Sequence, residues 1–219
     1  MKIIILIIIF NIILCLSSKC TERKSLNLRG IFDKNKEKSY AKNISQEIVN
    51  ISYLYGDDDI RGVIKNRLGD SVYISPAVPF IPELFDEVAT AALEEAKAGK
   101  PALIPVNLGS HWTALAIRKK SCGKIIILYN DSMGDSYTNG SESSHYITKL
   151  KQIEANLEVF DLQVHQQTDG TSCGAYTSEN LIAFAKLDDD KLTAEAAKAV
   201  LGTIINAQEL RNKQILDYC

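Results

Sequence analysis

Four residues of this 219-residue chain have the types and settings that cysteine chemistry requires. Cys173 follows a glycine-containing turn and begins a helical pattern, and the partial positive charge at a helix N-terminus favours a thiolate. A thiolate nucleophile needs a base, and His111 comes directly before an apolar, strand-like run. Asp131 follows the next such run and is expected to orient His111, while Gln167 is expected to donate a hydrogen bond to an oxyanion.

Each of these residues also has a plainer interpretation when it is taken alone. A single cysteine is most often an inert buried thiol, and a histidine at a strand end is commonly a satisfied sheet-edge residue. Asp131-Ser132 reads as an ordinary turn, and Gln166-Gln167 as a polar loop. The order and setting of all four residues together favour nucleophilic catalysis over these separate readings.

The strands that must position the base and its partner are visible as apolar runs. Runs over 102–108, 112–117 and 124–129 predict three consecutive strands joined by short turns. His111 and Asp131 would then emerge side by side from neighbouring strands. Short strands are also expected over 72–74 and 157–165.

Helices are expected before and after this strand cluster. The predicted helices span 57–68, Pro82 to Gly99, 144–155 and 173–186, and a single amphipathic helix capped by Thr193 is expected over 193–216. Helices, then strands, then helices make the α+β class the predicted fold.

The amino-terminal residues differ from the rest of the chain. Lys2, the apolar run from Ile3 to Leu16, and Ser17-Ser18 predict a secretory signal peptide over residues 1–18. The run is shorter than the about 20 residues of a membrane span, and an uncleaved anchor is the alternative. Polar residues 19–50 predict a linker, and residues 51–219 the folded domain.

The overall composition excludes several classes of protein. Lysine and arginine number 25 against 27 acidic residues, a net charge of −2, so no basic excess exists for a nucleic-acid partner. Five cysteines without a C-x-x-C pair indicate neither a disulfide scaffold nor a structural zinc site. Neither a metal nor an organic cofactor is expected.

Three motifs resemble the ubiquitin-like-protein-specific cysteine proteases of the CE, or adenain-like, clan, which includes SUMO and NEDD8 proteases and bacterial effector deubiquitinases. The motifs are Gly109-Ser110-His111-Trp112, Tyr129-Asn130-Asp131-Ser132 and the run from Gln166 through Cys173 to Gly174, within a resemblance over residues 53–185. The resemblance implies a papain-like or adenain-like fold with a central mixed or antiparallel sheet and flanking helices. It makes Cys173 the nucleophile, His111 the base, Asp131 the orienting acid and Gln167 the oxyanion donor.

The same resemblance implies residues that bind the substrate, a conjugate of ubiquitin or a ubiquitin-like protein. Trp112 would form one wall of a slot that admits only a Gly-Gly tail, and Tyr55 the opposing wall, where the SUMO proteases carry Trp. Asp58 and Gly174 are also expected to contact the substrate. An acidic cluster at a helix start explains Asp57-Asp58-Asp59 equally well.

Two other functions compete with proteolysis. Effectors of the same clan transfer acetyl groups to Ser, Thr or Lys with a Cys-His pair, and a ubiquitin-like-binding module without activity is the non-enzyme alternative. The signal segment predicts a secreted protein, which we interpret as an exported bacterial effector acting in a host-cell cytosol. Secretion from a eukaryotic cell is the alternative, although Asn130-Asp131-Ser132 would then be a glycosylation sequon overlapping the site.

Overall fold

The structure is a computed structural model that describes residues 50–76, 82–139, 141–204 and 206–216. The chain divides into two units, residues 1–40 and 41–219, and the described residues all belong to the second. The predicted signal segment over 1–18 and nearly all of the predicted linker over 19–50 lie outside the described residues.

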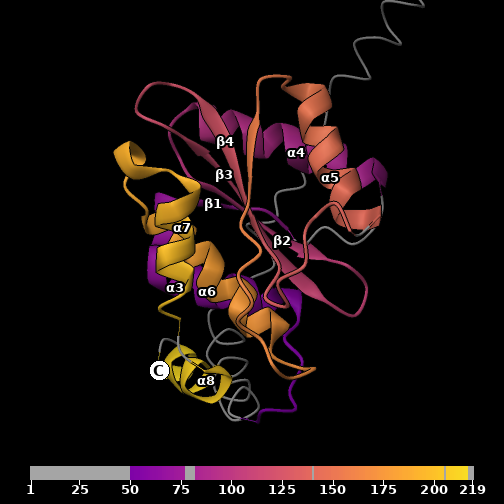
Figure 1. Cartoon of the computed structure of the whole chain (residues 1–219), viewed down its shortest axis with the longest axis vertical. Coiled ribbons are helices and arrows are strands. Elements are labelled where there is room, and N and C mark those ends of the chain that lie inside the picture. The colour runs from indigo at the N-terminus through magenta and orange to yellow at the C-terminus, as the bar shows by residue number, and fades with distance from the viewer. Residues whose placement is uncertain (1–49, 77–81, 140, 205, 217–219) are drawn as a thin grey trace, which may run out of the picture. The chain divides into compact units, whose positions relative to one another are not determined.

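A five-stranded sheet in the order β1-β2-β3-β4-β5 forms the centre of the described unit (Figure 1). Its strands are β1 (Tyr73–Ile74), β2 (Ala102–Asn107), β3 (Trp112–Lys119), β4 (Ile125–Asn130) and β5 (Glu158–Asp161). The two outer pairs are parallel and the two inner pairs antiparallel, so the sheet is mixed. The predicted strands are confirmed, although β5 is much shorter than the run expected over 157–165.

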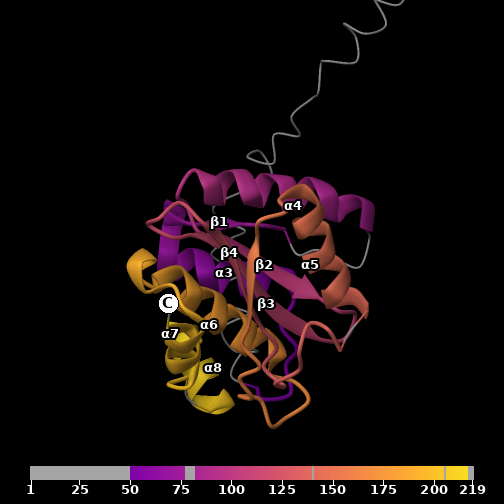
Figure 2. The same ribbon diagram turned by 45° about the horizontal axis from the view of Figure 1, so that its top comes forward.

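Two layers of helices cover the sheet, one on each face (Figure 2). One layer contains α3 (Asp57–Leu68), α6 (Cys173–Lys186), α7 (Ala194–Leu201) and α8 (Ala207–Leu216). The other contains α4 (Pro82–Lys97) and α5 (Ser141–Ile153). Short 3-10 turns over Gly69–Ser71 and Asp189–Lys191 follow α3 and α6. The α+β class with a mixed sheet and flanking helices is thus confirmed.

Alternating side chains of the inner strands divide the hydrophobic core into two clusters. Ala114 and Ala116 of β3 pack into the cluster beneath α3 and α6, whereas Leu115 and Ile117 pack into the cluster beneath α4 and α5. Successive side chains of a strand point to opposite faces, so this division follows directly from the sequence. Small residues on the first face let α6 approach the sheet closely.

The start of α3 is fixed by its third acidic residue. The Asp59 carboxylate accepts hydrogen bonds from the Gly56 backbone N–H (2.7 Å) and from the Tyr53 hydroxyl (2.8 Å). A carboxylate in the first turn satisfies N–H groups that have no partner within the helix. The predicted helix over 57–68 is confirmed with both its boundaries.

The prediction of a single helix over 193–216 is wrong, because two separate helices occupy this region. Thr193 caps the first, α7, by accepting a hydrogen bond from the Ala196 N–H (3.1 Å). Gly202 ends α7, and the Asn206 side chain then accepts from the Glu209 N–H (3.1 Å) to begin α8. Glycine favours helix termination and asparagine favours a helix start, so these residues divide an otherwise continuous apolar pattern.

Candidate active site

Cys173 is the first residue of α6 and is almost completely buried. The loop before it is held by the Asp169 carboxylate, which accepts hydrogen bonds from the backbone N–H groups of Thr171 (2.8 Å) and Ser172 (2.7 Å). The side chain of Cys173 therefore emerges at the N-terminus of a long helix, from a loop with little freedom. Partial positive charge at this position favours the thiolate.

His111 and Asp131 meet at one edge of the sheet. His111 precedes β3 and Asp131 follows β4, and these strands pair antiparallel with Ala114 opposite Asn130. The Nε2 atom of His111 lies 2.8 Å from Oδ1 of Asp131, which is buried. The same oxygen accepts from the Met133 backbone N–H (2.8 Å), so the carboxylate is fixed from both sides.

The His111 imidazole also interacts with the Cys173 thiol, and this interaction changes the pKa of both groups. Burial lowers the pKa of His111, but the hydrogen bonds to Asp131 and Cys173 outweigh it and raise that pKa to about 10. Burial raises the pKa of the Cys173 thiol, whereas the His111 hydrogen bond and backbone N–H groups hold the net pKa below its ordinary value. The arrangement favours a thiolate–imidazolium pair at neutral pH.

Gln167 is held in place by Ser132, a residue of the second motif to which the sequence assigns no role of its own. The Ser132 hydroxyl donates to Oε1 of Gln167 (2.7 Å), and the Ser132 carbonyl accepts from the Gln167 backbone N–H (2.9 Å). The amide nitrogen of Gln167 donates to the Asp169 carbonyl (2.6 Å). One of its two N–H bonds is thus directed at the loop before Cys173, and the second is left for a ligand.

A groove of about 470 Å³ leads to Cys173. Its lining residues come from the segment before α3, the β2–β3 turn and the start of β3, and they are Leu54, Tyr55, Gly56, Asp57, Asn107, Gly109, Ser110, Trp112 and Cys173. Trp112 is nearly buried, and its indole N–H donates to the Tyr55 carbonyl (2.9 Å). The two predicted wall residues are therefore in contact.

Tyr55 contributes to the groove differently from the expected opposing wall. Its side chain is only 3% exposed, and its hydroxyl donates to Gln214 (2.8 Å) in the interior. Its neighbour Leu54 is 60% exposed and lines the groove. Leu54 thus presents a larger surface to the groove than Tyr55 does. Successive side chains of an extended segment point in opposite directions. The position of Leu54 beside a buried aromatic residue would therefore have indicated that it faces the groove.

Gly174 lies behind the groove, against Tyr55. A Cβ atom at this position would lie 2.4 Å from the Tyr55 Cβ, a distance that side chains do not tolerate. Gly174 is buried and is not among the groove-lining residues. The glycine lets α6 approach the segment before α3, so it sets the position of the groove wall relative to Cys173.

The three acidic residues at the start of α3 occupy different environments. Asp59 is the buried helix cap described above, Asp57 lines the groove and pairs with Arg61 (3.6 Å), and Asp58 is exposed outside the groove lining. The helix-start interpretation accounts for Asp59. Of the other two, Asp57 is nearer to the path of a substrate than Asp58.

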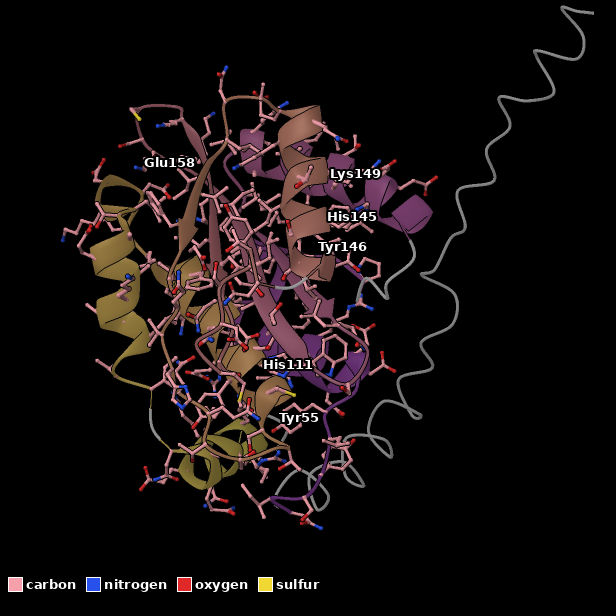
Figure 3. The ribbon with its side chains drawn as sticks, turned by 45° about the vertical axis from the view of Figure 1, so that its right-hand side comes forward. Tyr55, His111, His145, Tyr146, Lys149 and Glu158 are labelled. Atoms are coloured by element: carbon pink, nitrogen blue, oxygen red, sulfur yellow. The ribbon has the colours of Figure 1, made fainter. Side chains whose placement is uncertain are left out.

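The remaining histidines and the sequon lie apart from this chemistry. Figure 3 shows Tyr55 close to His111, whereas His145 lies on α5 at a distance. His165 is exposed and contacts the Met133 carbonyl through Nδ1 (2.7 Å). Asn130 is fully buried and donates to Gln166 (3.1 Å), so this fold has no room for a glycan on its amide.

Within the described part of the chain, Cys122 is an exposed free thiol and Cys173 a buried one. No group of three or more His, Cys, Asp or Glu side chains that could hold a metal ion occurs among these residues. None of the helices in the same ranges is long and apolar enough to cross a bilayer.

Comparisons with known proteins agree with this fold. Residues 100–203 match the RickCE-like catalytic domain, a range that contains the candidate nucleophile, base and acid. A solved de-sumoylating protease has a TM-score of 0.51 at 14% identity, with 80% of this chain and 85% of that chain covered. No curated protein sequence matches.

Two solved bacterial effectors are similar at lower scores. RickCE from Rickettsia bellii is 17% identical with a TM-score of 0.48, and the match covers 75% of this chain and 91% of that chain. XopD from Xanthomonas campestris, bound to ubiquitin, is 15% identical with a TM-score of 0.49 over the same shares. Residues 100–203 thus resemble a RickCE-like catalytic domain, and the chain shares its fold with the solved de-sumoylating protease.

Proposed function

We propose that this protein is a thiol protease or isopeptidase that cleaves after the C-terminal Gly-Gly of ubiquitin or a ubiquitin-like modifier. One observation carries the proposal: the His111 imidazole is bonded to the Asp131 carboxylate and interacts with the Cys173 thiol at the end of a groove. A thiolate, an oriented imidazolium and a path for an extended peptide are the parts that acyl transfer to cysteine needs.

The Cys173 thiolate attacks the carbonyl carbon of the terminal glycine, and the carbonyl oxygen becomes an oxyanion. The Cys173 backbone N–H, free of helix hydrogen bonding at the first position of α6, and the second N–H of Gln167 donate to that oxyanion. His111 gives its proton to the leaving lysine amine as the C–N bond breaks, which leaves a thioester. Neutral His111 then takes a proton from water, and hydroxide releases the modifier and restores the thiolate.

The groove selects glycine by width. Trp112 and Leu54 line it near Cys173, and Gly109 and Gly56 contribute backbone surfaces to it. A tail residue with a side chain would collide with these walls, whereas a Gly-Gly tail passes between them in an extended conformation. The carboxylate of Asp57 is available to a basic residue upstream of the two glycines.

A panel of fluorogenic C-terminal conjugates of ubiquitin, SUMO, NEDD8 and an ISG-type modifier tests this function. We expect turnover of at least one conjugate, with a loss of at least about a thousandfold in Cys173→Ala. Parallel incubation with acetyl-CoA and a Ser-, Thr- and Lys-containing protein tests the acetyltransferase alternative. Acetyl transfer without hydrolysis of any conjugate would contradict the proposal, and activity persisting in Cys173→Ala would contradict the assignment of the nucleophile.

We also propose that the protein is exported and acts in a host-cell cytosol. The apolar segment from Ile3 to Leu16 supports export, and a reactive thiolate needs a reducing compartment in which to act. Expression of the full chain in a bacterium, followed by N-terminal sequencing of secreted protein, should show cleavage near Ser18. Retention of the intact chain in the cytoplasm would contradict this part of the proposal.

A further inference from the structure

Arg211 is a charged residue that the proposed reaction does not use, although it is completely buried. It lies on α8, and 37 residues separate it from Cys173. Burying a guanidinium group is costly unless its N–H groups are hydrogen-bonded. The partners of Arg211 therefore indicate what this residue fixes.

The guanidinium group of Arg211 joins two segments that are distant in sequence. Its Nη1 atom donates to the Asn50 carbonyl (3.1 Å), and Nη2 donates to the Tyr53 carbonyl (2.9 Å). Nη2 also contacts the Thr171 carbonyl (3.0 Å) and the Ser172 hydroxyl (3.3 Å). One planar group thus holds both the segment that leads into the groove wall and the loop that presents Cys173.

Gln214, one helical turn further along α8, connects the same two regions. Its Oε1 atom accepts from the Tyr55 hydroxyl (2.8 Å), and its amide nitrogen donates to the Ala175 carbonyl (3.0 Å). The guanidinium carbon of Arg211 also lies 5.1 Å from the centre of the Tyr55 ring. Two side chains of α8 therefore fix the groove wall to the first turn of α6.

We propose that Arg211 and Gln214 are positioning residues, which set the distance between the groove wall at 53–55 and the Cys173 loop. The inference rests on the proposed function, because the exact position of Cys173 affects catalysis only if this thiol is the nucleophile. Two side chains bridge the same pair of segments independently. If only stability were needed, apolar residues could supply it, so the two polar bridges argue for control of geometry. A misplacement of about 1 Å at a reacting centre costs up to roughly 100-fold in rate.

The chain contains its own controls for a test. Lys213 is two residues from Arg211 on the same helix, but its side chain is 54% exposed and pairs with the buried carboxylate of Glu179 on α6 (3.0 Å), away from the groove wall and the Cys173 loop. Arg211→Gln and Lys213→Gln therefore remove the same charge from the same helix, one inside and one outside the bridge. Exposed Cys122, in the β3–β4 turn, is an internal reference for thiol reactivity.

The experiment measures iodoacetamide labelling of Cys173 relative to Cys122 at about pH 6 by peptide mass spectrometry. An ordinary thiol is only roughly 0.3% ionised at this pH, so labelling reports a thiolate stabilised in the folded site. We expect the Cys173-to-Cys122 ratio to fall about tenfold or more in Arg211→Gln and in Arg211→Lys, because lysine lacks the planar fork. Lys213→Gln should stay within about twofold of the wild type.

Gln214→Met tests the groove wall separately. It should raise the KM for a ubiquitin-like conjugate several-fold, with a smaller change in Cys173 labelling than Arg211→Gln produces. Folding is checked by the thermal unfolding midpoint of each variant. Wild-type labelling in folded Arg211→Gln, or failure of both Arg211 variants to fold, would overturn the proposal by assigning Arg211 to stability alone. Wild-type Cys173 no more reactive than Cys122 would instead contradict the proposed function itself.

Discussion

The two faces of the sheet are packed by different kinds of residue. The face under α4 and α5 is covered by an apolar cluster in which the Phe85 and Tyr146 rings pack in a tilted arrangement with centres 4.4 Å apart. The opposite face, under α3, α6, α7 and α8, contains buried polar and charged side chains as well as apolar ones. Among them are Asp59, Glu179, Asn180, Arg211 and Gln214.

Buried polar groups are concentrated on the face that carries Cys173, and each makes specific bonds. Glu179 of α6 pairs with Arg67 of α3 and with Lys213 of α8, and Asn180 exchanges hydrogen bonds with Gln166. Directional bonds define one arrangement of elements, whereas apolar contacts tolerate several. The comparison suggests that the apolar face provides mainly stability and that the polar face provides the geometry of the site.

Of the variants that test the difference between the two faces, His111→Asn is expected to have the largest effect on catalysis. Loss of the imidazole should lower kcat by at least about a thousandfold and return the Cys173 thiol toward its ordinary pKa. Cys173 labelling at neutral pH should fall accordingly, with little change in thermal stability. His165→Asn, at an exposed histidine, is the matched control and should keep nearly full activity; equal losses in the two variants would contradict the role of His111.

The pH dependence of wild-type activity should follow from the ionisation of Cys173 and His111. The rise of activity with pH should lie at lower pH than an ordinary thiol would give, because the pKa of Cys173 is lowered. Activity should fall as the pH rises through about 10, because His111 then loses the proton that the leaving amine needs. A profile that rises only above about pH 8.5, as for an unperturbed thiol, would contradict the thiolate–imidazolium pair.

Gly174→Ala should disturb the packing of the polar face where α6 contacts Tyr55. The added methyl group would lie within van der Waals overlap of Tyr55, so α6 or the groove wall must move. We expect a loss of roughly 1–3 kcal/mol in unfolding free energy and about a tenfold to hundredfold loss of kcat/KM. Gly170→Ala is the control, because a Cβ there meets nothing within 4 Å; unchanged kinetics in Gly174→Ala would disprove the tight coupling.

Leu54→Ala should have a smaller effect, restricted to substrate binding. Removing this exposed groove residue should raise KM by about threefold to tenfold and leave kcat nearly unchanged, since apolar contact with the tail is lost. Discrimination between Gly-Gly and Ala-Gly tails should decrease as the groove widens. Ile153→Ala, at another exposed apolar side chain on the opposite face, should change neither parameter.

Phe85→Ala should have the smallest effect on catalysis and tests the apolar face. The cavity should lower the free energy of unfolding by about 3–5 kcal/mol, as measured with urea. Within the temperature range where the variant remains folded, kcat should stay within about twofold of the wild type. A tenfold fall in kcat of the folded variant would show that the two faces are not separable in the way proposed here.

Local patterns in the sequence were sufficient for most of the fold. Continuous apolar runs predicted β2, β3 and β4, and the turn before Cys173 predicted the start of α6. The meeting of His111 and Asp131 followed from the order of the strands alone. The helix over 193–216 was wrong because its apolar pattern continues across Gly202, and the pattern was given more weight than the glycine.

Contacts between distant segments could not be predicted in this way. Tyr55 and Gln214 are 159 positions apart, and neither has a local signal that identifies its partner. The exposure of Leu54 in the groove depends on that buried contact of Tyr55, so it could not be predicted from the sequence. The burial of Arg211 had only a weak signal in the sequence, namely its place directly after the apolar Leu210. The other basic residue of this helix, Lys213, is exposed.

The alternation of side chains along β3 and β4 has a consequence for how chains with this fold can diverge. A slip of one residue in their pairing would move Leu115 and Ile117 into the face built for Ala114 and Ala116. The spacing of His111 and Asp131 is therefore protected by residues that touch neither. Core side chains can be exchanged over long evolutionary times while this alternation is kept, so a lineage can lose most of its sequence likeness without losing the register on which its chemistry depends.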